Sequence, residues 1–209
     1  DYTAVSTTPL TFSPSETSKV IPISVVADNL DEIDETVIVT LANPSNASIS
    51  DATGVLTISD DDPEPSLSVD NSTTSDENSA DVTVRLSSAS AKNISVGLGT
   101  SSGTATSGTD FNSFSTSVSF NAGETAQTVT IPLINDTLDE DNEAFTVTLS
   151  GPTNASISSS TATITILDDD PTPTLSIQDV SQNENSGTAS AIVLLSAASA
   201  KDVTVNYAT

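Results

Sequence analysis

The chain contains no cysteine, methionine, tryptophan or histidine, and only 3% of its residues are aromatic. Without cysteine there is neither a disulfide framework nor thiol chemistry, and without histidine the commonest general base and transition-metal ligand is missing. Basic residues are scarce as well, because 4 Lys and Arg stand against 29 Asp and Glu, which gives a formal net charge of -25. Nucleic acids and anionic membranes attract basic residues, and no apolar run is long enough to cross a membrane. The sequence therefore predicts no nucleic-acid partner and no membrane insertion, and leaves carboxylates as its strongest chemistry.

These carboxylates recur along the chain. The segment 16–63 aligns without a gap with 124–171, and a third register begins at Thr174. The period is about 108 residues, which is the length of a whole domain rather than of one solenoid turn. The sequence thus predicts a tandem array of domains.

The repeat boundaries divide the chain into three predicted parts. Residues 1–63 are the C-terminal part of one domain, 66–172 are a complete domain, and 174–209 are the N-terminal part of a further domain. Each boundary carries Asp-Asp-Asp-Pro followed by a second proline, and prolines restrict the backbone, which predicts a short stiff connector. The two ends are out of phase by one polar loop, equivalent to 101–109, so we expect the chain to be an excerpt from a longer periodic protein.

Short segments of the complete repeat alternate apolar and polar residues, as in Val82, Val84 and Leu86. A period of two is typical of half-buried strands. The predicted strands cover 66–70, 80–87, 93–99, 115–120, 127–134, 143–150 and 160–167. About seven strands in roughly 100 residues are typical of an immunoglobulin-like sandwich. The predicted fold class is all-β, as tandem immunoglobulin-like antiparallel β-sandwiches.

Four motifs occur together in the complete repeat: Glu77-Asn78-Ser79, Gly-Thr-Asp-Phe at 108–111, an acidic run at 136–145, and Ile-Leu-Asp-Asp-Asp at 166–170. As a set they resemble the Calx-beta domain. That family includes calcium-sensing modules of sodium/calcium exchangers, an extracellular repeat of an integrin subunit and long bacterial surface proteins. The resemblance implies a Calx-beta type sandwich of about seven strands for each repeat.

The same resemblance implies Ca²⁺ as the bound ion, in loops that converge at one end of each sandwich. Calcium takes about six to eight oxygen ligands, and carboxylates that share a site repel one another unless a cation lies among them. The implied ligands of the complete domain are Glu77, Asp110, Asp136, Glu140, Glu143, Asp168, Asp169 and Asp170. Those of the first partial domain are Asp1, Asp28, Glu32, Glu35, Asp60, Asp61 and Asp62, and the last partial domain supplies only Glu184. Asn135 and Ala27 stand where multi-calcium members carry a further acid, so we expect fewer or more weakly bound ions.

Three classes of function compete for this sequence. The favoured one is a calcium-binding structural module of a long repetitive extracellular protein, a calcium-stiffened stalk, adhesin or filament on a bacterial surface. The alternative is a calcium-sensing regulatory domain of a larger transporter or receptor. An enzyme is not expected, because no nucleophile and base stand in a recognisable pattern. Arg85 and the three lysines are interpreted as surface charges.

The expected partners are calcium and neighbouring repeats of the same protein, placed end to end in a homopolymeric or bundled filament. Two versions of this arrangement remain open. One is a continuous covalent array. In the other, 174–209 of one chain completes the sandwich that begins at residue 1 of the next. We favour the covalent array, because a half-sandwich exposes unpaired strand edges.

Overall fold

The structure is a computed structural model that describes residues 1–75 and 78–209. Its elements, in chain order, are β1 (Glu35–Thr40), β2 (Thr53–Ile58), β3 (Ser66–Val69), β4 (Ser72–Thr74), β5 (Ser79–Leu86), β6 (Ile94–Ser101), β7 (Ser115–Phe120), β8 (Ala126–Pro132), β9 (Glu143–Thr153), β10 (Ser156–Ser159), β11 (Thr161–Ile166), β12 (Leu175–Ile177), the 3-10 helix η1 (Glu184–Ser186) and β13 (Val193–Leu195). Across the described ranges, no helix has the length and hydropathy needed to span a membrane.

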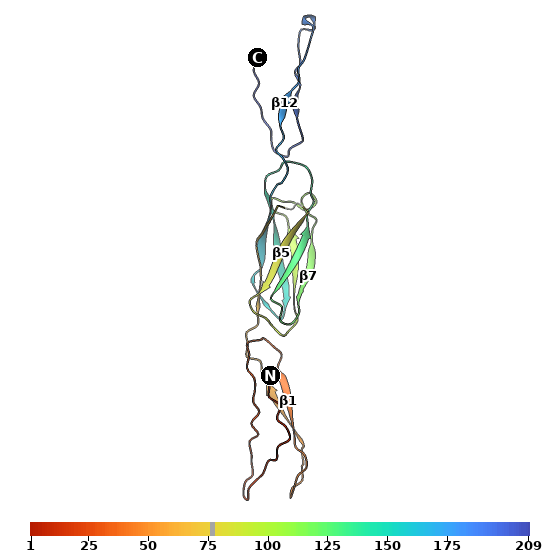
Figure 1. Ribbon diagram of the computed structural model, residues 1–209. Coiled ribbons are helices and arrows are strands. Elements are labelled where there is room, and N and C mark those ends of the chain that lie inside the picture. The colour runs from red at the N-terminus through yellow and green to blue at the C-terminus, as the bar shows by residue number, and fades with distance from the viewer. Residues whose placement is uncertain (76–77) are drawn as a thin grey trace.

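The chain forms a long, narrow molecule in three consecutive parts (Figure 1). The middle part is a β-sandwich that contains β5 and β7. The part with β1 extends from one end of this sandwich, and the part with β12 extends from the opposite end. The three parts therefore follow one another along one axis rather than packing side by side.

Two sheets form the middle part. The strand order is β10-β3-β5-β8 in the four-stranded sheet and β4-β11-β9-β6-β7 in the five-stranded sheet. Every second residue of a strand faces the other sheet, so that β5 buries Ala80, Val82, Val84 and Leu86 between them. The prediction of an immunoglobulin-like all-β sandwich is confirmed, and the predicted strands agree with β3, β5, β6, β7, β8, β9 and β11 to within a few residues at each end.

The antiparallel expectation fails at two pairs. β3 is followed closely by β4, and β10 is followed closely by β11. In both cases the chain crosses from the four-stranded sheet to the five-stranded sheet. The first and last segments of the domain therefore run side by side twice, with β10 parallel to β3 and β11 parallel to β4. The strands β4 and β10 were not predicted, because three or four residues are too few to show alternation.

The two halves of the middle sandwich complete each other. β3, β5 and β6 come from its first half, and they pair with β10, β8 and β9 from its second half. In the parts on either side, β1 pairs with β2 and β12 pairs with β13. Apolar side chains such as Ile38, Val55 and Ile177 are exposed there. The continuous buried core lies within 67–166.

Candidate metal centre

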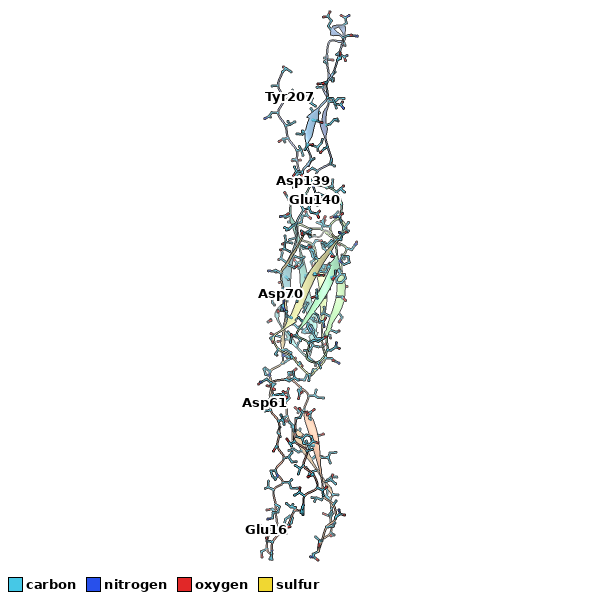
Figure 2. All side chains as sticks on the ribbon, viewed as in Figure 1. Glu16, Asp61, Asp70, Asp139, Glu140 and Tyr207 are labelled. Atoms are coloured by element: carbon cyan, nitrogen blue, oxygen red, sulfur yellow. The ribbon has the colours of Figure 1, made fainter. Side chains whose placement is uncertain are left out.

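Most of the ligands predicted for the complete domain gather at one end of the middle sandwich because of how β9 and β11 pair. These strands are antiparallel neighbours, and Glu143 at the start of β9 lies opposite Ile166 at the end of β11. The acidic segment that leads into β9 and the aspartates that follow β11 therefore lie next to each other at the same end of the sheet. Figure 2 labels Asp139 and Glu140 at this end, where the sandwich adjoins the part that carries β12.

A third segment, the loop between β6 and β7, is anchored at this end by Phe111. Phe111 is fully buried and stacks on Phe145 of β9, with ring centroids 4.5 Å apart and an interplanar angle of 24°. Asp110 directly precedes Phe111, so the stack carries its carboxylate towards Glu143. The N–H groups and hydroxyls of the loop hold one carboxylate oxygen, since Thr106 N–H donates to Asp110 Oδ2 at 2.6 Å.

The same loop lies very close to the start of β9. A Cβ atom on Gly103 would lie 2.4 Å from the carbonyl oxygen of Ala144, which leaves room only for glycine. The Thr104 hydroxyl oxygen accepts a hydrogen bond from Ala144 N–H at 2.8 Å, and Ala105 N–H donates to the Ala144 carbonyl at 2.9 Å. These contacts fix the loop against the strand that begins with Glu143.

Two of these segments, the β6–β7 loop and the acidic segment that leads into β9, bring their carboxylates within coordination distance of one ion. One oxygen each of Asp110, Glu140 and Glu143 lies within 4.8 Å of the other two. Calcium binds oxygen at about 2.3 to 2.6 Å, so two of its ligands can be up to about 5 Å apart. Asp136 and Asp168 line the same hollow. Its volume of about 30 Å³ exceeds the roughly 10 to 15 Å³ that a single water needs.

The electrostatics of this hollow favour a bound cation. The pKa of Glu143 is raised to about 7, mainly by burial, and also by the negative charge of Asp110, a hydrogen bond with Asp110, and the charges of Glu140 and Asp141. Burial also raises the pKa of Glu140, with smaller contributions from the charges around it. Both shifts mean that the ionised carboxylates are destabilised until a positive charge compensates them.

Two carboxylate oxygens in the same region are buried without a hydrogen-bond partner. They are Asp168 Oδ1 and Asp170 Oδ2. A buried acceptor without a partner costs about 1 to 3 kcal/mol, and more when it is charged. Burial, together with the charges of Asp168 and Asp169, raises the pKa of Asp170. Hard oxygen donors without nitrogen or sulfur ligands suit calcium or magnesium rather than zinc or copper. The residues present therefore fit a hard divalent cation.

The first part of the chain carries a second centre of the same kind. One oxygen each of Asp1, Asp28 and Glu32 lies within 4.8 Å of the other two. All seven ligands predicted for this part line one hollow of about 100 Å³: Asp1, Asp28, Glu32, Glu35, Asp60, Asp61 and Asp62. Burial, followed by the charges of Asp61, Asp60 and Asp28, raises the pKa of Asp62.

The remaining predicted ligands are placed differently. Asp169 is exposed and does not line the hollow, although its neighbours on both sides reach the interior. Glu184 lies exposed in η1, and among the residues that the structure describes it belongs to no cluster of acidic side chains. Glu77 lies outside the described residues.

Sequence reasoning missed several residues of these centres. Asp141 lines the middle hollow, but Ile33 occupies the matching position of the first repeat, so recurrence could not reveal it. Asn142 accepts a hydrogen bond from Asp168 N–H at 3.1 Å, and Asp34 accepts the equivalent bond from Asp60 N–H at 3.1 Å. Both residues position the aspartates that follow the last strand. The signal available in the sequence was their recurrence three residues after Asp31 and Asp139.

Lys92 and Lys201, which are interpreted from the sequence as surface charges, are partly exposed but also pair with buried aspartates. Lys92 donates to Asp31 at 2.7 Å, and Lys201 donates to Asp139 at 2.8 Å. The bond with Lys201 is the main reason why the pKa of Asp139 is lowered. These pairs lie beside the two metal centres and join consecutive parts of the chain.

Comparison with known proteins shows which family and which solved structures the chain is similar to. The Calx-beta domain family matches residues 1–62 and 60–170. Among solved structures, the apo-form Calx CBD1 domain is 27% identical with a TM-score of 0.48, and the match covers 52% of this chain and 100% of that one. The calcium binding domain CBD12 of CALX1.1 is 28% identical with a TM-score of 0.46, covering 50% of this chain and 44% of that one.

CBD12 from CALX1.2 is 27% identical with a TM-score of 0.47, covering 54% of this chain and 49% of that one. The match therefore spans less than half the length of each CBD12 structure. No curated protein sequence matches the chain. Since the family match extends over most of the sequence and covers both acidic centres, the chain belongs to the Calx-beta domain family.

Proposed function

We propose that the chain is a calcium-binding structural module of a longer repetitive protein, in which successive domains form a calcium-stiffened stalk, adhesin or filament. The observation that carries this proposal is the convergence of carboxylates from three separate segments around buried oxygens that have no protein partner. Membership of the Calx-beta domain family supports it.

The proposed ligands of the middle domain are the predicted residues that line the hollow or carry a buried oxygen without a partner, namely Asp110, Asp136, Glu140, Glu143, Asp168 and Asp170. Asp169 and Glu77 remain sequence-based proposals. The ion would compensate the mutual repulsion of these carboxylates and connect the β6–β7 loop, the segment before β9 and the segment after β11. Ions at both centres would thus stabilise the ends of the domains, where the chain passes from one part to the next.

The two centres lie in equivalent positions of successive repeats, one near each connector. This serial placement supports the division of the chain into 1–63, 66–172 and 174–209, and it supports neighbouring repeats as the partners. We propose an extracellular or bacterial cell-surface location, where calcium is available at millimolar concentration, and no catalytic activity.

A second candidate is a calcium-sensing regulatory module of a larger transporter or receptor. Glu140 faces the middle centre, and its neighbour Asp139 contacts the next part of the chain. This adjacency favours the second candidate, because an ion bound at the centre could then affect the next part directly. Affinity separates the two candidates. Sensors bind calcium at about 0.1 to 10 µM, whereas extracellular modules bind it at about 0.1 to 1 mM.

The test is thermal unfolding of the whole chain in chelator and in about 10 mM calcium, a concentration above the dissociation constants of weak extracellular sites. With a dissociation constant of about 1 mM, binding to the folded state alone adds about 1.4 kcal/mol of stability. We expect the melting temperature of the middle domain to rise by about 4 to 8 °C. Magnesium should add less, because it releases its waters reluctantly. Equal melting temperatures in chelator and calcium would contradict the proposal.

Matched variants locate the site. Glu140→Ala should remove most of the calcium-dependent gain of the middle domain and leave its strands intact. Asp81→Ala changes the charge by the same amount, but Asp81 lies exposed on β5, where it accepts a hydrogen bond from the Thr130 hydroxyl at 2.6 Å. Calcium titration calorimetry should distinguish the two variants. If they bind calcium alike, the assignment of the middle centre is wrong.

A further inference from the structure

At the first boundary, one segment of the middle domain encloses an aspartate of the preceding part. Asp31 is only 3% exposed. Its Oδ1 accepts a hydrogen bond from Lys92 Nζ at 2.7 Å, and its Oδ2 accepts one from the Ser90 hydroxyl at 2.7 Å. Its backbone carbonyl accepts from Ala91 N–H at 3.0 Å. Three consecutive residues of one domain therefore satisfy both carboxylate oxygens and the carbonyl of one residue in the other.

The second boundary repeats this arrangement with different residues. Asp139 is 5% exposed, and it accepts hydrogen bonds from Lys201 Nζ at 2.8 Å, from the Ser199 hydroxyl at 3.1 Å and from Ala200 N–H at 3.2 Å. A parallel β-bridge accompanies each set, between Asp31 and Ser90 and between Asp139 and Ser199. The same Ser-Ala-Lys sequence thus makes the same contacts twice in one chain.

The serine also shapes the segment that carries the lysine. Lys92 N–H donates to the Ser90 hydroxyl oxygen at 3.0 Å, and Lys201 N–H donates to the Ser199 hydroxyl oxygen at 3.0 Å. Each segment is therefore held in the conformation that directs its hydroxyl, its N–H and its ammonium group at one residue. A group of donors arranged in this way recognises a carboxylate together with its own backbone carbonyl.

The aspartate is distinct from the proposed calcium ligands, although it lies beside them. Successive side chains of an extended segment point to opposite sides, so Glu140 faces the hollow while Asp139 faces the next part of the chain. Lys201 Nζ lies 3.8 Å from Asp168 Oδ2, and Lys92 Nζ lies 3.8 Å from Asp60 Oδ2. The positive charge at each joint is thus a lysine ammonium group, which the following repeat supplies.

We propose that the Ser-Ala-Lys segment of each repeat is a docking element for the buried aspartate of the preceding repeat, and that this joint holds consecutive repeats end to end without calcium. Its partner is any Calx-beta repeat whose acidic run carries an aspartate directly before the glutamate, as Asp31-Glu32 and Asp139-Glu140 do. This goes beyond the proposed function, because the joint needs no bound ion.

The test measures the spread of interdomain distances across the first joint. The chain has no cysteine, so Thr57→Cys and Ser119→Cys place two spin labels at exposed positions, one on β2 and one on β7. In chelator we expect a narrow distance distribution for the parent chain. Lys92→Gln should broaden it, because loss of one partner of a buried hydrogen-bonded pair shifts the opening equilibrium by about tenfold or more.

The matched control is Lys19→Gln, which removes the same charge from an exposed pair with Glu16 at 2.8 Å and should leave the distribution narrow. Asp31→Asn with Lys92→Gln should broaden it no more than Lys92→Gln alone, since both changes break one joint. The melting temperature of the middle domain reports whether each variant remains folded.

A narrow distribution for Lys92→Gln in chelator would overturn the proposal. So would a parent distribution that is broad in chelator and narrow only in calcium, because the ion would then hold the joint. If calcium leaves the melting temperature of the parent chain unchanged while Lys92→Gln still broadens the distance distribution in chelator, the joint stands and the calcium proposal fails.

Discussion

Glu143 makes the stability of the middle domain depend on pH in a direction that calcium should reverse. Its pKa lies at about 7, compared with the ordinary value of 4.5. Between these values the folded protein keeps a proton on Glu143 that the unfolded chain has lost. In chelator, the stability contribution of this proton is complete below about pH 4.5 and disappears as the pH rises through about 7.

The size of the effect follows from the shift. Each pKa unit corresponds to about 1.4 kcal/mol, so the whole shift from 4.5 to about 7 corresponds to about 3 kcal/mol. Part of the Glu143 side chain contacts solvent, which screens its repulsion. We therefore expect a loss of about 1 to 2 kcal/mol between pH 5 and pH 8 in chelator. The raised pKa values of Glu140 and Asp170 act in the same direction.

Calcium needs the ionised carboxylate, so the gain in stability from the ion should increase over the same pH range. The assay is scanning calorimetry of the whole chain at pH 5, 6, 7 and 8, in chelator and in calcium. Isothermal titration near pH 6, in two buffers of different ionisation enthalpy, should show the release of about one proton for each ion bound at the middle centre.

The Glu143→Gln variant tests the assignment. It cannot ionise, so it should lose most of the pH dependence in chelator and release no proton at the middle centre. At pH 8 in chelator it should be more stable than the parent chain, because one repelling charge is gone. The control Asp81→Asn removes an exposed charge outside the centre and should behave like the parent. If Glu143→Gln keeps the full pH dependence, or if the parent becomes more stable from pH 5 to pH 8 in chelator, the reasoning about this carboxylate is refuted.

Two further predictions concern the framework that positions the centre. Gly103→Ala should destabilise the middle domain by about 1 to 3 kcal/mol, because the new methyl group would lie 2.4 Å from the carbonyl oxygen of Ala144. The control Gly99→Ala places its methyl group where no atom lies within 4 Å, so it should change the melting temperature little. Phe145→Ala should cost about 3 to 5 kcal/mol in urea unfolding and weaken calcium binding, because the stack with Phe111 carries the Asp110 loop; calcium affinity equal to that of the parent would show that the loop is positioned by other contacts.

Much of the architecture follows directly from the amino-acid pattern. The period-two alternation around Val82 and Val84 requires a strand with one buried face, and the structure has β5 there. Recurrence of acids at matched positions, together with the resemblance to the Calx-beta domain, predicted as ligands the acids that line the hollow of the first part, including Asp28 and Glu32. Both signals are local or periodic, so no knowledge of the tertiary contacts was needed to detect them.

The neighbouring residues Asp139 and Glu140 show what the pattern leaves open. Both acids recur in both repeats, as Asp31 and Glu32 do, so recurrence assigns them the same importance. Their roles depend on the direction of each side chain from an extended backbone, which places Glu140 in the hollow and Asp139 against Lys201. Those directions follow from the packing of β9 against β11 and from the position of the next repeat.

The sequence by itself therefore determined the all-β fold, the tandem repeat and the acidic segments that could bind a cation. Only the tertiary structure decided that β10 runs parallel to β3 and β11 parallel to β4, that Asp141 lines the hollow, and that Glu140 lines the hollow while Asp139 contacts Lys201. The physical reason is that periodic burial is encoded residue by residue along a strand, whereas a shared site depends on contacts between segments that lie far apart in the chain.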